Sequence, residues 1–318
     1  LETIPSKALN QVPGNITMPE KKDTLTKLVS QTQHNIATTA KETVATLKAN
    51  STMSKAEIAK LVTAFKQVTT SLSLEQLTSL KATLAKTPEA VLKAIATLDT
   101  ANIQKVMVAL SNVKTAPAQQ LMTALSDLKG PQLANLLQSV STLSEKQLTT
   151  LFQSLSKVPN DKQQLSTLLK ALSTVPNNKG QLTSLLKSLS SLSRTQLTTI
   201  LKSLSQVPNN KQQLTKLLTT LASLNQDVQK AVLSALATIP SGKELTALLT
   251  ALSNLKTDAS KQFLHNLTTL LSKPQQEIVL KSISAIPDPE KSATLLKSIA
   301  SLSKESLQAF MHALSTLD

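Results

Sequence analysis

An apolar stripe recurs along this chain at a nearly constant interval, and it restricts the fold more than any other feature. Leu165, Leu168, Leu169, Leu172 and Val175 lie at offsets 0, 3, 4, 7 and 10. These offsets place the five side chains on one face of a helix of about three turns. Successive copies lie 15 to 17 residues apart, with their first positions at residues 133, 148, 165, 182, 197 and 214. Each interval therefore predicts one short helix and one loop.

The segments between the stripes carry residues that begin and end helices. Ser144 is followed three residues later by Gln147, which is the pattern of a capping box. The same pattern recurs in two other places, Ser54/Glu57 and Ser193/Gln196. A second kind of loop reads Val-Pro-Asn, at residues 158–160, 175–177 and 207–209. Proline ends the preceding helix, and we expect the asparagine to cap the next one.

Stripe and loops together predict an all-α fold, an α-solenoid of short helical hairpins with 15–17 residues per helix and 30–34 per pair. We expect a right-handed superhelix. Residues 58–318 have room for about 17 such helices. Four glycines in the whole chain are too few for a β-rich or nucleotide-binding fold. Two alternatives are a long coiled coil, which needs uninterrupted heptads, and a compact bundle, whose core rarely grows beyond ~250–300 residues.

Three parts of the chain differ in pattern. Residues 1–22 contain Pro5, Pro13, Gly14 and Pro19, and we expect an extended or disordered lead-in there. Residues 23–57 have a weaker stripe and are predicted to form an N-terminal helical cap, because solenoid ends need a more polar unit. Residues 58–318 are the predicted solenoid. Their leucine-rich repeats resemble α-solenoids as a class, although tetratricopeptide, ankyrin and armadillo signatures are absent.

Residue types that carry catalysis are sparse. His34, His265 and His312 have no spacing suited to zinc, and the chain has no cysteine. Asp288 and Glu290 flank a proline, which indicates turn and cap residues and not an acid–base pair. Phosphate-binding and nucleophile motifs are absent. We therefore expect a protein that is not an enzyme, with no cofactor, no metal and no small-molecule substrate.

The net charge of +15 makes basic residues the main candidates for binding a partner. One set lies three residues before a stripe, where a helix dipole disfavours a cation: Lys55, Lys162, Lys179, Arg194, Lys211, Lys273 and Lys304. Free N–H groups at helix starts would add to their attraction for anions. A second set lies at stripe offset five: Lys93, Lys170, Lys187, Lys202, Lys281 and Lys297. Solvation of the surface alone also accounts for such lysines.

Two functions follow from these patterns. The first is a scaffold that binds a protein partner along its surface, and the second is a basic solenoid that binds nucleic acid or another polyanion through phosphates. The Ser-, Thr-, Gln-, Asn- and Lys-rich helices resemble those of secreted bacterial effectors that scaffold host proteins. We expect a soluble protein, since no signal peptide is visible and no apolar run reaches the ~20 residues of a spanning helix. The compartment stays open, and an intracellular or a translocated protein is compatible with the sequence. Binding of amphipathic helices to a lipid surface is a third and weaker alternative.

Overall fold

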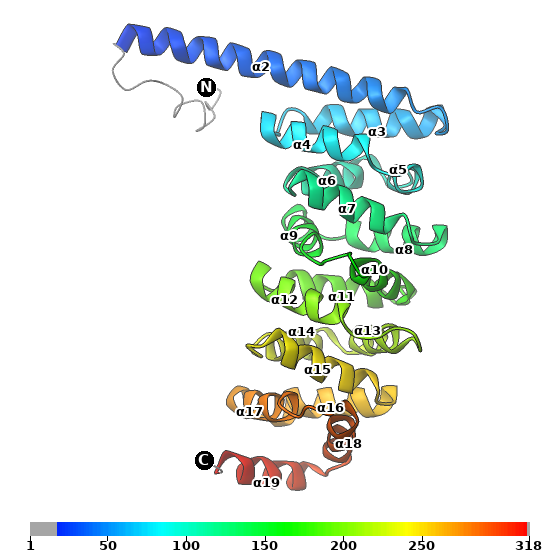
Figure 1. The fold of residues 1–318 in the computed structure, drawn as a ribbon, viewed down its shortest axis with the longest axis vertical. Coiled ribbons are helices and arrows are strands. Elements are labelled where there is room, and N and C mark those ends of the chain that lie inside the picture. Colours follow the sequence, from blue (N-terminus) through cyan, green and yellow to red (C-terminus); the bar gives the residue numbers. More distant parts are fainter. Residues whose placement is uncertain (1–17, 317–318) are drawn as a thin grey trace. The chain divides into compact units, whose positions relative to one another are not determined.

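The computed structural model of the chain describes residues 18–316 (Figure 1). This part consists of eighteen helices and contains no strand, so the predicted all-α helical-repeat fold is confirmed. The helices are α2 (Met18–Lys48), α3 (Lys55–Val68), α4 (Leu74–Ala85), α5 (Glu89–Ala96), α6 (Thr100–Ser111), α7 (Thr115–Leu125), α8 (Gly130–Ser141), α9 (Glu145–Leu155), α10 (Gln164–Thr174), α11 (Gln181–Ser190), α12 (Arg194–Ser205), α13 (Gln213–Ser223), α14 (Gln226–Leu236), α15 (Gly242–Ser253), α16 (Thr257–Leu270), α17 (Lys273–Ser284), α18 (Pro289–Ala300) and α19 (Lys304–Ser315).

The chain divides into two compact units, Leu1–Gln119 and Gln120–Asp318, and the division falls within α7. The boundaries that we expected from the sequence differ from the helix limits. Helix α2 already begins at Met18, because Pro19 occupies the first turn, where a missing N–H costs nothing. The expected boundary at residue 57 lies inside α3. Residues 1–17 of the expected lead-in lie outside the described residues.

The capping boxes that the sequence predicts at Ser54, Ser144 and Ser193 are confirmed. In each box the serine hydroxyl accepts a hydrogen bond from the third helical residue, whose side chain accepts one from the serine N–H. Two further boxes, at Ser73 and Ser272, start α4 and α17. Both pairs end in glutamine and were readable from the sequence by the same rule.

Close packing links helices that are two or three apart in the chain. In unit Gln120–Asp318, α9, α12, α15 and α18 pack in succession, and so do α8, α11, α14 and α17. In unit Leu1–Gln119, α3 packs on α5 and α6. Among the helices that the structure describes, the successive pairs α2/α3, α16/α17 and α17/α18 are also in close contact. This order of packing repeats along the unit, and Figure 1 shows the layers that it produces between α8 and α19.

A small buried residue explains how helices three apart approach so closely. In α3, α4 and α6 to α15 it lies directly before the last position of the apolar stripe within the helix, and the residue is at most 6% exposed: Ala64, Thr83, Ala109, Ala124, Ser139, Ser154, Ala171, Ser188, Ser203, Thr220, Ala235 and Ala251. Ser188 of α11 donates a hydrogen bond to Gln229 of α14, and Ser203 of α12 donates one to the Gly242 carbonyl of α15 at 3.5 Å. In these two pairs the helix three places further along therefore packs against this position.

The Val-Pro-Asn loops form one repeated structure. Before α10, Asn160 Oδ1 accepts a hydrogen bond from Ser166 N at 3.1 Å, and the Pro159 carbonyl accepts one from Leu165 N at 3.1 Å. The residue before the helix has a left-handed backbone, with φ of 59° at Gln163. The other two loops repeat this geometry, with φ of 72° at Gly180 and 60° at Gln212. The asparagine caps the helix, as predicted, but from six residues away.

Candidate binding surface

The first set of basic residues lies where helices begin. Lys55, Arg194, Lys273 and Lys304 are the first residues of α3, α12, α17 and α19. The other three lie two residues before α10, α11 and α13: Lys162, Lys179 and Lys211. All seven side chains are exposed.

At each of these helix starts, the protein itself supplies an acceptor for one or two of the backbone N–H groups. In α3, α12 and α17 a capping serine accepts from the third residue of the helix. Ser303 accepts from Ser306 N at 3.2 Å in α19. Before α10, α11 and α13 an asparagine and a proline carbonyl are the acceptors. The caps satisfy part of each helix start, and the basic side chains place a positive charge beside it.

The second set lies on the exposed flanks of helices. Its members are Lys170 of α10, Lys187 of α11, Lys202 of α12, Lys281 of α17 and Lys297 of α18. Within residues 18–316, neither the seven residues of the first set nor these five lysines form an ion pair with a carboxylate. These charges are therefore open to a partner.

Lys93 is the exception in the second set. Its Nζ lies 2.8 Å from Glu89 Oε1, and this hydrogen bond raises the pKa of Lys93 above its ordinary value. The same contact, together with a hydrogen bond from Thr52, lowers the pKa of Glu89. Lys93 is already neutralised within the fold, so we exclude it from the binding surface.

Positive charge is concentrated in one stretch of unit Gln120–Asp318. The unit has 20 Lys and Arg against 11 Asp and Glu, a net charge of +9. Residues 162–226 contain eight of these basic residues and no acidic residue, a net charge of +8. The remainder of the unit has 12 basic and 11 acidic residues and is almost neutral. We call residues 162–226 the basic segment. Counting charge along the sequence would have found it.

Packing gathers the basic segment into one part of the unit. Its helices are α10 to α13, and close contacts join α10 with α12 and α13, and α11 with α13. Seven of its eight basic side chains are exposed, and the eighth, Lys216, is half-buried. The segment unites seven residues of the two predicted sets and leaves Lys55, Lys273, Lys281, Lys297 and Lys304 outside it.

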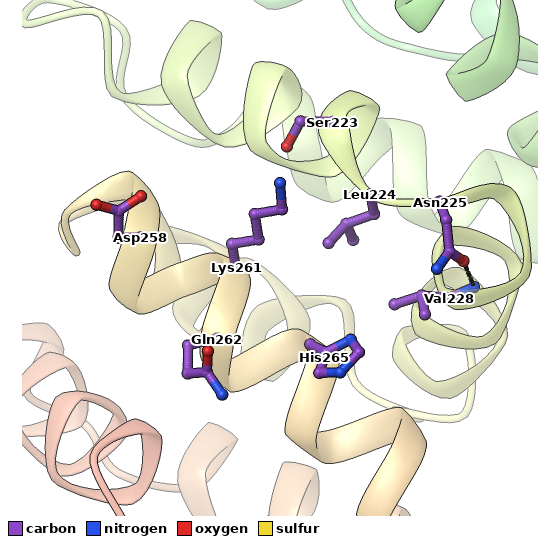
Figure 2. A pocket seen from close by; sticks show the side chains of 8 residues that line it. All are labelled: Ser223, Leu224, Asn225, Val228, Asp258, Lys261, Gln262 and His265. Carbon is purple, nitrogen blue, oxygen red and sulfur yellow. Dashed lines mark hydrogen bonds between the residues drawn. The ribbon is translucent and has the colours of Figure 1, made fainter.

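A groove lies beside the last helix of the basic segment. It has a volume of about 570 Å³ and runs between the α13–α14 connection and α16. Figure 2 shows Lys261 and His265 reaching from α16 towards α13 and α14. Leu224 and Val228 are buried and form an apolar floor. No sequence signal pointed to this groove, because its two sides are joined only by packing.

The groove offers contacts for a side chain and not a catalytic arrangement. Asn225 is engaged in capping α14, since its Oδ1 accepts from Val228 N at 2.9 Å. Asp258, Lys261 and His265 form no hydrogen bond or ion pair with one another. General acid–base catalysis needs a base that a second group orients. The groove presents one cation, Lys261, and one carboxylate, Asp258, beside an apolar floor, and this lining suits a polar or amphipathic side chain of a partner.

Other titratable groups have structural positions. The Asp288 carboxylate accepts from Glu290 N at 2.9 Å at the start of α18, as the predicted cap role requires. His34, His265 and His312 lie on three different helices, α2, α16 and α19. Among residues 18–316, no three His, Asp or Glu side chains gather as metal ligands. No helix in this range has the length and apolar character needed to cross a bilayer.

Comparison with known proteins identifies no relative. No protein-family model matches the chain, and neither the curated proteins nor the solved structures contain a significant match. Any functional conclusion therefore depends on the residues and geometry described above.

Proposed function

We propose that this protein is a non-catalytic helical-repeat scaffold that binds a protein partner along its surface. The observation that carries the proposal is that basic side chains on the repeated helices of the unit Gln120–Asp318 are exposed and form no ion pair within residues 120–316. Stacked helical repeats present extended surfaces to their partners.

The character of the surface supports polar recognition. Among the residues whose exposure the structure describes, Met18 is the one large apolar residue that is strongly exposed. The apolar stripes are used in packing the helices together, so a partner meets Lys, Gln, Asn, Ser and Thr side chains. Such an interface gains specificity and speed of association from charge complementarity. A reversible interaction is the expected result.

Peptide display tests this proposal by offering the protein a large and varied set of partner segments. We expect the immobilised full chain to enrich particular sequences from a library of random 16-residue peptides, and these to bind with micromolar dissociation constants in solution. A lysine-rich helical bundle of equal net charge serves as the control for non-specific attraction. Failure to enrich any sequence beyond this control would argue against a protein-binding scaffold.

The net charge of +15 favours nucleic acid as a second candidate partner. Binding through phosphates releases counterions, so affinity falls steeply as salt rises. A salt titration with mixed-sequence RNA and duplex DNA measures that slope. If neither nucleic acid is retained at physiological salt, this second function is excluded.

A further inference from the structure

We infer that the basic segment, residues 162–226 in α10 to α13, is the docking surface of this scaffold and that its partner is an acidic polypeptide segment. The inference depends on the proposed scaffold function and names both the surface and the chemistry of its ligand. It starts from the local net charge of +8 within a unit that is otherwise almost neutral.

The fold itself does not explain this concentration of charge. Capping serines, asparagines and proline carbonyls stabilise the starts of α10 to α13, and none of these bonds uses a lysine or arginine side chain. A cation at a helix start is unfavourable by roughly 0.3–1 kcal/mol when exposed. Lys162, Lys179 and Lys211 nevertheless recur at equivalent loop positions. Binding of a negatively charged ligand accounts for lysines at these positions, whereas the stability of the helices does not.

The spacing of the charges favours a polypeptide over a nucleic acid. Packed helices lie roughly 8–10 Å apart. An extended polypeptide covers this distance in about three residues, so a carboxylate at every third residue can meet one packed helix after another. Duplex nucleic acid carries a charge for about every 1.7 Å of its axis, far more densely than these lysines are placed.

The residue types also favour a polypeptide over a nucleic acid as the partner. Proteins that bind single strands stack bases on aromatic side chains, which contributes roughly 1–3 kcal/mol per base. The chain has no Trp or Tyr and four Phe. None of those four is exposed in the structure, and Phe65, Phe152 and Phe263 are buried. The basic segment also contains seven lysines against one arginine, Arg194, whereas base reading relies on the arginine fork.

Calorimetric titration of the full chain tests the inference with defined probes. The acidic probe is a 21-residue peptide with seven Glu-Gly-Ser repeats, and the neutral probe has Gln in place of each Glu. A 20-nucleotide single strand and a 20-base-pair duplex represent nucleic acid. We expect the acidic peptide to bind, the neutral peptide not to bind, and both nucleic acids to bind more weakly than the acidic peptide at 0.15 M salt.

Two matched triple variants locate the surface. K170Q/K187Q/K202Q removes three exposed charges from the basic segment, and K230Q/K256Q/K291Q removes three exposed charges from the same unit outside it. We expect the first variant to bind the acidic peptide about tenfold more weakly, from three exposed contacts of modest strength. The second should change affinity by less than twofold. Thermal unfolding followed by circular dichroism verifies that both variants are folded.

The outcomes separate this inference from the scaffold proposal. Equal loss of affinity in both triple variants, or equal binding of the acidic and neutral peptides, overturns the basic segment as the docking surface. Tighter binding of either nucleic acid than of the peptide overturns the polypeptide partner. If peptide display enriches sequences without acidic residues, the scaffold proposal stands and only the present inference fails.

Discussion

Two glutamines adopt a backbone conformation that favours glycine. Gln163 and Gln212 have φ near 60°, in the left-handed region, and the third loop of this kind has Gly180 at the same place. A side chain in this region costs roughly 1–2 kcal/mol. The Val-Pro-Asn loop demands the conformation, because it turns the chain so that the asparagine and the proline carbonyl reach the first turn of the helix.

Exchange of residues at this loop position should therefore change stability in opposite directions. We expect Gln163→Gly to raise the free energy of unfolding by about 0.5–1 kcal/mol. Glycine relieves the backbone strain at this position, and part of this gain is lost because glycine also raises the conformational entropy of the unfolded chain. Gly180→Gln should lower it by a similar amount, since a Cβ at Gly180 meets no atom within 4 Å and only the backbone is strained. Urea denaturation measures both. If Gln163→Gly and the native chain were equally stable, backbone strain at Gln163 would be contradicted.

Ser154 offers a test of the small buried position between helices. Its hydroxyl is buried and has no hydrogen-bond partner among the described residues. We expect Ser154→Ala to leave stability unchanged or to raise it by about 1 kcal/mol, because a buried unsatisfied hydroxyl is removed. Ser154→Leu should lower stability by about 1–3 kcal/mol through overpacking. Denaturant midpoints compare the two, and tolerance of leucine would refute close packing at this residue.

At the scale of the helix, the capping boxes come in a titrating and a non-titrating form. The backbone N–H of Ser54, and then its hydroxyl, hold the pKa of Glu57 below its ordinary value at the start of α3. In the capping boxes of α4, α9, α12 and α17, a glutamine occupies the position that Glu57 occupies in α3. A carboxyl whose pKa is lower in the folded chain stabilises the fold above its ordinary pKa, and this contribution disappears as pH falls through the folded pKa.

Glu57→Gln should consequently reduce the acid sensitivity of unit Leu1–Gln119. The variant keeps the hydrogen bonds of the box, as the glutamine boxes do, so we expect an unfolding temperature close to native at pH 7. Between pH 5 and pH 3 the unfolding temperature should fall less than in the native chain. Thermal melts across this range measure the difference. A parallel fall in both proteins would show that Glu57 does not contribute.

On the scale of the molecule, the basic segment should make stability depend on salt. Unpaired cations on packed helices repel one another, and added salt shortens the Debye length from about 30 Å at 0.01 M to about 8 Å at 0.15 M. We expect the unfolding temperature to rise by roughly 2 °C over this range, which corresponds to an increase of somewhat less than 1 kcal/mol in the free energy of unfolding. K170Q/K187Q/K202Q should show a smaller rise. A fall with salt would mean that attractive pairs dominate.

Most of the local structure was readable from the residues alone. The stripe from Leu165 to Val175 requires a helix with one apolar face, and Ser144 with Gln147 marks a helix start, because both patterns depend only on geometry within one or two turns. The αL backbone at Gln163 was not readable, since glutamine shows no preference for it. The groove at Lys261 and His265 was not readable either, because it depends on which helix lies opposite.

The sequence by itself determined an all-helical chain of short, capped units and the acid-free stretch from 162 to 226. Only the tertiary structure decided that helices pack with neighbours two and three places along and that α10 to α13 gather the basic residues. The physical reason is that an apolar stripe states which face of a helix is buried but not against which partner. That choice depends on the fit of small residues such as Ser188 and Ser203 to a distant helix start.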